Sequence, residues 1–354
     1  MDNLTHSLVG ALLGQAGLKT KTGLAMPALI IGANLPDVDA ACFFWLEGQE
    51  HLGFRRGITH GPPALVLLPL ILAGLLWGYD RWQAKRGKRP EGRLPVHFGW
   101  LYALSFIGCL THPALDWLNV YGIRLLEPFS SQWFYGDTLF IIDVWLWALM
   151  GFATWFSLRR EGKGENWIKP ARVAIAVSLA YIGLNGAITV HAEEQGNKLV
   201  QHAYEIEPTM VVASPPPIKF WEREILFRRD ATAEEGGGAL YGKGMFDVFS
   251  GPVFFTRVGR MGESKNITLQ SPKGSYGWQV LSTNFGDVER AARLVAKDDP
   301  EVAAFLFWSR MPVFVEGNCY RAPIIYDQRF SDPRAIGRFT VALPDVKCEE
   351  FPTD

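Results

Sequence analysis

The sequence predicts an α-helical membrane domain with about four to six membrane helices, followed by a small β-rich extracytoplasmic domain. Long apolar runs are confined to the first part of the chain, and the short loops between them are basic. The second part contains β-branched and aromatic segments bounded by Gly, Pro and Asn, a pattern typical of strands. We place the two domains at residues 1–190 and 191–354.

Composition excludes some classes of protein. The 354 residues carry a formal net charge of −1, whereas a nucleic-acid-binding protein is usually strongly basic, so no nucleic-acid partner is expected. Four cysteines are too few for a disulfide scaffold, although Cys319 and Cys348 could pair in an extracytoplasmic domain. The opening "MDNLTHSLVG" is acidic where a signal peptide is basic, so no cleaved signal is expected.

The apolar runs give the expected membrane helices, since a bilayer requires roughly 20 helical residues. The main runs are 64–79, which is slightly short, 98–118, 139–158 and 171–190. Two weaker segments, 4–18 and 23–36, are expected to be tucked in or tilted. Gly10, Gly14 and Gly17 would allow the first of them to pack closely against a neighbouring helix.

Loop charge sets the expected orientation. "RWQAKRGKRPEGR" (81–93) contains six Lys or Arg residues and "RREGKGENWIKPAR" (159–172) contains five. Short basic loops remain in the cytoplasm. The sequence therefore predicts a multi-pass protein of the bacterial inner membrane, with its C-terminal domain on the periplasmic side.

Polar residues from five separate segments are predicted to meet on that same side. The segments are "MDNLTH" with His6, "NLPDVD" with Asp37 and Asp39, "RRGITH" with Arg56 and His60, "THPALD" with His112 and Asp116, and "YGDTLFIID" with Asp137 and Asp143. Asn119 lies on the same helical face as His112 and Asp116, because residues four and seven positions apart share a face. Ionisable groups at membrane depth usually mark a functional site.

Imidazoles and carboxylates in this combination favour a divalent metal, with zinc expected first and manganese or iron as alternatives. The donors are too many for one tetrahedral ion, so we expect two ions, bridged by Asp116. The expected ligands are His6, Asp37, Asp39, His60, His112, Asp116 and Asp143. Asp143 could instead be a charge at a helix N-terminus, and Asp37 and Asp39 could form a turn after Pro36.

Two ions can clamp the attacking and leaving oxygens of a phosphoester and generate hydroxide at neutral pH. The expected catalytic residues are Asp116, His112 and Arg56, and Arg56 is expected to bind the substrate phosphate through its planar fork of donors. Arg55 and Arg124 are further candidates for phosphate contacts.

The quoted motifs, together with "THPALDWLNVYGIRLLEPFS", resemble the YdjM-like family of inner-membrane-associated, metal-dependent hydrolases over roughly residues 1–190. The resemblance implies a metal hydrolase. The family is sometimes labelled LexA-binding, which implies a cytosolic partner that nothing in these residues supports. A more distant similarity is to bacterial zinc-dependent phospholipase C, whose early motif order is matched by His6, Asp37, His60, His112 and Asp116. The further His-x-x-x-Glu pair of a trinuclear site is absent.

The second half is expected to be mainly strands, with one helix at 287–299. The expected strands are 252–259, 277–285, 305–315, 322–330 and 338–343, with an extended stretch at 207–221 and a flexible turn region at 233–244. No histidine follows residue 202, so a second complete metal site is not expected there.

These observations predict a membrane-bound, metal-dependent hydrolase that cleaves a phosphoester of a lipid or another amphiphile at the outer face of the inner membrane. Membrane lipid would be its substrate or its environment. The alternative is a non-enzymatic, metal-dependent membrane binding or transport protein, although a transporter more often places its polar groups near the bilayer midplane. A metalloprotease is disfavoured because the sequence has no His-Glu-x-x-His motif.

Overall fold

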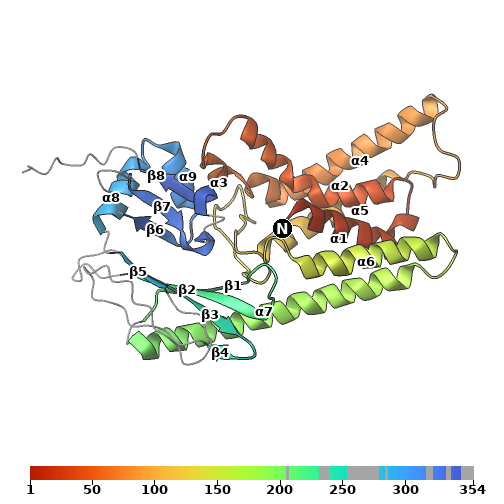
Figure 1. Cartoon of the computed structure of the whole chain (residues 1–354). Helices are drawn as coiled ribbons and strands as arrows, with labels where there is room; N and C mark the ends of the chain where they lie inside the picture. Colours follow the sequence, from red (N-terminus) through yellow and green to blue (C-terminus); the bar gives the residue numbers. More distant parts are fainter. Residues whose placement is uncertain are drawn as a thin grey trace, which may run out of the picture. The chain divides into compact units, whose positions relative to one another are not determined.

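The structure is a computed structural model, and it describes residues 1–204, 207–230, 239–252, 279–283, 286–315, 322–331 and 336–343. The chain forms two compact units (Figure 1). The first comprises residues 1–41, 56–187 and 217–220, and the second comprises residues 42–55, 188–216 and the described residues from 221 onward. The boundary expected at residue 190 falls inside a single helix, α7 (Ile168–Tyr204).

The first unit is helical. Its helices are α1 (Asn3–Gln15), α2 (Ala25–Asn34), α4 (Pro62–Lys85), α5 (Phe98–Trp117), α6 (Val144–Glu161) and the first part of α7. Three 3-10 segments are η1 (Leu18–Thr20), η2 (Leu35–Phe44), which continues α2 and ends in the second unit, and η3 (Ile58–His60). Helix α2 packs against α1 and α5, α4 packs against α5, and α6 packs against α1 (Figure 1).

Four helical segments are long and apolar enough to cross a membrane. They are Ala25–Phe44, Pro62–Lys85, Phe98–Trp117 and Ile168–His202. The main runs at 64–79, 98–118 and 171–190 are thereby confirmed, and the weaker run at 23–36 joins them because η2 lengthens it. The expected span at 139–158 is not among the four. Its helix, α6, begins only at Val144, where Asp143 caps the N-terminus, and ends in the charged residues Arg159, Arg160 and Glu161.

Glycines let α1, α2 and α5 approach one another backbone to backbone. A Cβ added at Gly10 would lie 2.7 Å from the carbonyl oxygen of Leu29, and one at Gly108 would lie 2.6 Å from the same oxygen. A Cβ at Gly32 would lie 2.7 Å from the Ser105 oxygen. Any side chain larger than hydrogen would push these helices apart. The expected close packing at Gly10 is confirmed, and Gly32 and Gly108 extend it to α5.

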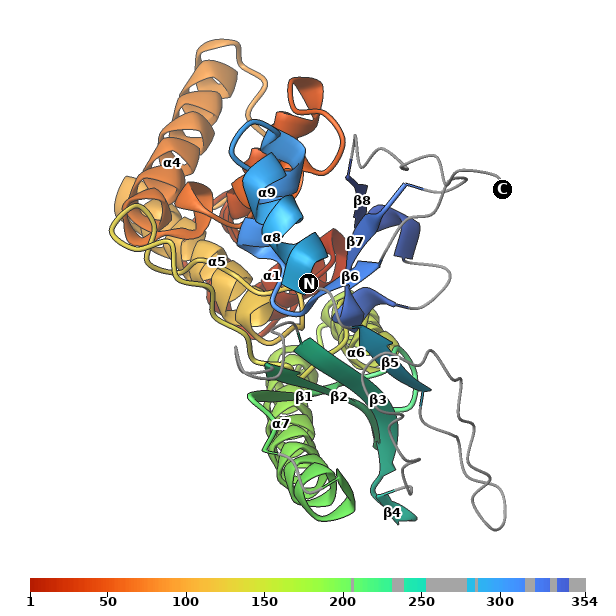
Figure 2. The same ribbon diagram turned by 90° about the vertical axis from the view of Figure 1, so that its left-hand side faces the viewer.

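The second unit contains two antiparallel sheets (Figure 2). The first has β1 (Met210–Ser214), β2 (Glu222–Asp230), β3 (Ala239–Asp247) and β4 (Gly251–Pro252) in that order, and β5 (Gln279–Thr283) also pairs with β3. The second has β6 (Pro312–Val315), β7 (Ile324–Asp327) and β8 (Thr340–Ala342) in that order. The 3-10 segment η5 (Gln328–Phe330) follows β7, and η6 (Ile336–Arg338) precedes β8. Ala192 and Val200 from the last part of α7 pack on Ile225 and Phe227 of β2.

Three further helices complete this unit: α3 (Glu50–Phe54), α8 (Gly286–Val295) and α9 (Pro300–Trp308). Helix α3 comes from the early part of the chain and packs against α9. The backbone amide of Gln49 donates to Glu301 at 2.9 Å, and Gly53 leaves room for Ala304. Residues 42–55 therefore fold with the C-terminal half of the chain, an assignment that their sequence did not suggest.

The expected strands at 277–285, 322–330 and 338–343 contain β5, β7 and β8, and the helix expected at 287–299 contains α8. The strand expected at 305–315 is wrong in its first half, because residues 305–308 form the end of α9, a helix whose N-terminus Asp299 caps. The turn region expected at 233–244 contains the start of β3. Cys319, Cys348 and most of the expected strand 252–259 lie outside the described residues.

A buried ion pair between Asp327 and Arg329 ties β7 to its surroundings. The carboxylate accepts from Nε and Nη2 of Arg329, each at 2.8 Å, and from the Ser309 hydroxyl at 2.6 Å. Burial tends to raise the pKa of Asp327, but the charge and hydrogen bonds of Arg329 outweigh it and hold that pKa below its ordinary value.

Asp327→Asn is predicted to destabilise the second unit by about 3–5 kcal/mol, because it leaves the Arg329 charge buried without its partner. In the native protein the contribution of Asp327 is complete above about pH 4, its ordinary unfolded value, and declines as the pH falls through the lower folded pKa. Urea unfolding followed by near-ultraviolet circular dichroism between pH 7 and pH 3 measures both effects. Asp298→Asn, at an exposed position, is the matched control, and equal losses in the two variants would contradict the prediction.

Candidate metal centre

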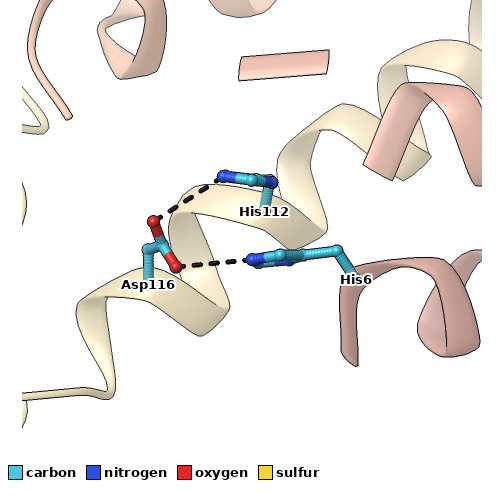
Figure 3. Close-up of side chains that lie close together, drawn as sticks. All are labelled: His6, His112 and Asp116. Carbon is cyan, nitrogen blue, oxygen red and sulfur yellow. Dashed lines mark ion pairs between the residues drawn. The ribbon is translucent and has the colours of Figure 1, made fainter. Parts of the chain in front are cut away.

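Two imidazoles, from two helices, meet at one carboxylate (Figure 3). The rings of His6 on α1 and His112 on α5 are stacked, with centroids 3.8 Å apart and planes 15° from parallel. His6 Nε2 lies 3.4 Å from Oδ1 of Asp116, and His112 Nε2 lies 3.6 Å from Oδ2 of the same residue. All three side chains are buried. Asp116 thus presents one oxygen to each imidazole.

A second group shares Nε2 of His112 with the first. Asp37 on η2 and His60 on η3 join His112 in a set whose ligand atoms all lie within 4.8 Å of one another. His112 Nε2 is 3.7 Å from Oδ1 of Asp37, and His60 Nε2 is 3.7 Å from Oδ2 of Asp116. Four of the five segments that the sequence predicted to meet therefore come together here, and the fifth, with Asp137 and Asp143, is in neither group among the described residues.

These separations suit direct metal binding. Ligand atoms bound tetrahedrally at about 2.0–2.1 Å from zinc lie about 3.3 Å from one another. The four nitrogen-to-oxygen distances around Asp116 and Asp37 range from 3.4 to 3.7 Å. They are too long for strong hydrogen bonds and close to the edge of such a tetrahedron. Both ring nitrogens of His6 and Nε2 of His112 are buried without a hydrogen-bond partner in the described part of the chain.

His112 can bind a metal through only one nitrogen. Its Nδ1 donates a hydrogen bond to the carbonyl oxygen of Ala33 on α2 at 2.7 Å, which fixes the ring. The lone pair of Nε2 is then the one that can bind a metal. A single nitrogen lone pair binds a single ion, although both groups of ligands include His112. If two ions bind, His112 serves one of them. Asp116 is then the residue whose two oxygens can reach both.

His6 is held in the neutral form that metals require. Burial lowers the pKa of His6 far below its ordinary value, and the neighbouring His112, the N-terminal ammonium group and Arg56 lower it further. A neutral imidazole keeps a lone pair available for a cation. The stacked arrangement with His112 would be unfavourable if both rings were charged.

Arg56 contacts Asp116 directly. Its Nε lies 2.9 Å from Oδ2 of Asp116, and its Nη1 donates to Oδ1 of Asn119 at 3.0 Å and to the Gly122 carbonyl at 3.2 Å. The guanidinium also lies over the Tyr121 ring, 4.5 Å from its centroid. Arg56 was expected to bind substrate phosphate, but the structure places its planar group against the central carboxylate. Asn119 joins the site through Arg56.

The Asp39 carboxylate holds the turn that carries Arg56 and His60. Arg56 has a positive φ of 55°, a conformation in which non-glycine residues are uncommon. Its backbone amide donates to Oδ2 of Asp39 at 2.8 Å, and Thr59 donates to the same oxygen at 3.2 Å. Asp39 Oδ2 also lies 3.6 Å from Nδ1 of His60. Asp39 thus fixes the turn and orients His60, and it belongs to neither of the two candidate ligand groups among the described residues.

The other expected residues lie outside the two groups. Asp143 caps α6, where it accepts from the amides of Trp145 and Leu146, and it also accepts from the Tyr181 hydroxyl at 3.0 Å. This is the helix-terminus alternative that the sequence left open. Asp137 is buried with a positive φ of 46°. Arg124 pairs with Glu127 at 2.9 Å, and Arg55 lies over the Phe43 ring in the second unit.

Sequence reasoning missed three parts of the site. The N-terminal ammonium group of Met1 contacts Oδ1 of Asp116 and is buried. The Ala33 carbonyl oxygen orients His112, and no side-chain pattern could have indicated a backbone group. Thr59, which contacts both Asp39 and His60, could have been found because it directly precedes His60 in the "RRGITH" motif.

A family model described as YdjM inner membrane protein matches residues 1–192, which is more than half of the chain. The matched range contains the residues of the two candidate ligand groups, His6, Asp37, His60, His112 and Asp116, which we call the His–Asp cluster. No curated protein and no solved structure matches the chain, so the similarity to phospholipase C stays a prediction. The chain belongs to the YdjM inner membrane protein family.

Proposed function

We propose that this protein is a membrane-bound, metal-dependent hydrolase that cleaves a phosphoester of a lipid or another amphiphile. The observation that supports the proposal is the convergence of three buried imidazoles on one buried carboxylate, Asp116, with the Asp37 carboxylate 3.7 Å from Nε2 of His112. Buried imidazole nitrogens and carboxylate oxygens that lack hydrogen bonds lower the stability of the fold if their role is purely structural. A divalent cation would satisfy them.

The donors divide between two positions. Asp37, His60 and His112 would hold one ion, zinc being the best match and manganese or iron the alternatives, and Oδ2 of Asp116 lies beside this group, 3.7 Å from Nε2 of His60 and 3.6 Å from Nε2 of His112. His6 and Oδ1 of Asp116 would hold a second ion with fewer protein ligands, which leaves room for water or substrate. When bound, such a pair of cations lowers the pKa of water and stabilises charge on phosphoryl oxygens.

The residues of the chain itself supply position. Asp116 would separate and bridge the cations, and the Ala33 carbonyl keeps Nε2 of His112 directed at the cluster. Arg56 is a positioning residue, because its Nε holds Oδ2 of Asp116 while Nη1 is anchored on Asn119 and Gly122. Partners that orient a metal ligand are worth about 10–100-fold in metal affinity or activity.

The surroundings favour an amphiphilic substrate. His112 and Asp116 lie at the C-terminal end of α5, one of the candidate membrane spans, and Asp37 lies within another. A site at the end of apolar helices is close to lipid headgroups. Placement of the metal centre on the periplasmic side is proposed from the basic loops at 81–93 and 159–172, which are expected in the cytoplasm, and it requires α6 to cross the membrane in addition to the four candidate spans. The non-enzymatic binder or transporter is the alternative to be tested.

Asp116→Asn is predicted to lower kcat by about 100-fold or more, because an amide bridges two cations poorly. Arg56→Ala is predicted to lower kcat and to raise the metal concentration needed for activity, with Arg56→Lys in between. The assay is turnover of a nitrophenyl alkyl phosphodiester in detergent with added Zn²⁺ or Mn²⁺. Arg55→Ala, one residue away and outside the cluster, is the matched control.

A raised KM with unchanged kcat in Arg56→Ala would instead assign Arg56 to substrate binding. If Asp116→Asn kept full activity, or if no phosphoester were cleaved with any metal tried, the hydrolase proposal would be replaced by the non-enzymatic alternative.

The proposed orientation places residue 85 in the cytoplasm and residue 250 in the periplasm. Single cysteines at Lys85 and Ser250, in a variant without the four native cysteines, are to be labelled in intact cells with a membrane-impermeant maleimide. Labelling at 250 and not at 85 is expected. Labelling at 85 alone would reverse the orientation and move the metal centre to the cytoplasmic side.

A further inference from the structure

The first unit contains an apolar cavity of about 400 Å³ between α1, α5, α6 and α7. Its walls include the buried side chains of Leu12, Leu115 and Met150. Thr111 and Ser178 are its only hydroxyl-bearing lining residues. Nothing in this lining would bind a polar ligand, so the cavity suits hydrocarbon.

The cavity opens toward the surface that a membrane would cover. Two of its four walls, α5 and α7, are candidate membrane spans. Among its lining residues Trp117 is 45% exposed and Leu179 is 64% exposed, so these side chains mark an apolar opening. Such an opening would expose hydrocarbon to water in a soluble protein, whereas in a bilayer it faces lipid chains.

The cavity lies beside the His–Asp cluster on the same helix. Leu115 directly precedes Asp116, and Thr111 directly precedes His112. Consecutive Cα atoms are about 3.8 Å apart. On α1, Val9 of the cavity lies one helical turn beyond His6. A single amphiphilic molecule could therefore occupy the cavity with its apolar part and reach the cluster with its polar part.

We infer that this cavity binds one alkyl or isoprenyl chain of the substrate while the phosphoester lies at the His–Asp cluster. The inference rests on the proposed function, because it takes the phosphoester from there and adds the class of its apolar substituent. A volume of about 400 Å³ is at the lower end of the range for ligand pockets, roughly 300–1,000 Å³, and so favours one chain over two.

Ser178 offers a matched pair of variants. Its side chain is buried, and its hydroxyl has no hydrogen-bond partner in the described part of the chain, so removing the hydroxyl breaks no such bond. Ser178→Phe fills the cavity, whereas Ser178→Ala removes the hydroxyl and leaves the space. Ser178 is on α7 and contributes nothing to the metal ligands.

The experiment compares nitrophenyl dodecyl phosphate with nitrophenyl butyl phosphate in the same detergent. Because a long chain concentrates in detergent around any membrane protein, the decisive comparison is between variants. Ser178→Phe is expected to raise KM for the dodecyl substrate by about tenfold or more, since several methylenes lose their place, and to leave the butyl substrate unchanged. Ser178→Ala is expected to match the wild type. A wild-type KM for the dodecyl substrate in Ser178→Phe would overturn the inference.

A second measurement needs no turnover. Dodecyl phosphate with a diazirine at the end of its chain is expected to label peptides from α5, α6 or α7 that line the cavity, in wild type and Ser178→Ala and not in Ser178→Phe. Labelling confined to other lipid-facing segments would overturn the inference even if Ser178→Phe failed to fold. If the cavity were labelled but no phosphoester were cleaved, the proposed function would fail and the chain site would stand. If both substrates were cleaved and Ser178→Phe had the same KM values as the wild type, the proposed chain-binding site would fail and the proposed function would stand.

Discussion

A carboxylate buried at the end of an apolar helix must be compensated, and Asp116 is such a group. Its side chain is almost inaccessible to water, and an isolated charge there would carry a desolvation penalty of several kcal/mol. Arg56, His6, His60 and His112 all direct nitrogen atoms at it. Arg56 and the N-terminal ammonium group also contact Asp116, and neither satisfies the imidazoles. One or two divalent ions between the rings and the carboxylates would compensate both.

The helices can bring these groups together because their backbones nearly touch. Gly10, Gly32 and Gly108 remove the side chains that would separate α1, α2 and α5. The same close approach lets the Ala33 carbonyl on α2 accept from His112 on α5. Packing and ligand orientation are thus one structural feature. On its other side α5 lines the apolar cavity, so one helix lies between that cavity and the candidate metal centre.

The sequence predicted which side chains come together better than it predicted the fold. His6, Asp37, His60, His112 and Asp116 could be found because imidazoles and carboxylates rarely occur in apolar helices by chance, and helical periodicity places His112 and Asp116 on one face. The sequence could not separate Asp39 and Asp143 from the ligands. The residue type is the same, and only geometry shows that one fixes a turn and the other caps a helix.

Long-range packing explains most of the remaining differences. Residues 42–55 join the C-terminal unit through α9, a contact between segments about 250 positions apart that no local pattern encodes. The apolar segment at 305–315 resembles a strand until the cap at Asp299 is known to begin a helix. Arg56 was assigned to phosphate because arginine commonly binds it, whereas its partner here is a carboxylate 60 residues away in the chain.

The central claim is that Asp116 joins two metal positions that use different histidines. Elemental analysis of the bound metal tests it most directly. It compares the purified wild type with His6→Ala, His112→Ala and a His97→Ala control outside the cluster. About two equivalents are predicted for the wild type and the control, and about one for His6→Ala, which leaves the position formed by Asp37, His60 and His112 intact. His112→Ala should lose the ion at that position. Full metal content in His112→Ala, or a single equivalent in the wild type that survives both substitutions, would contradict this account of the metal centre.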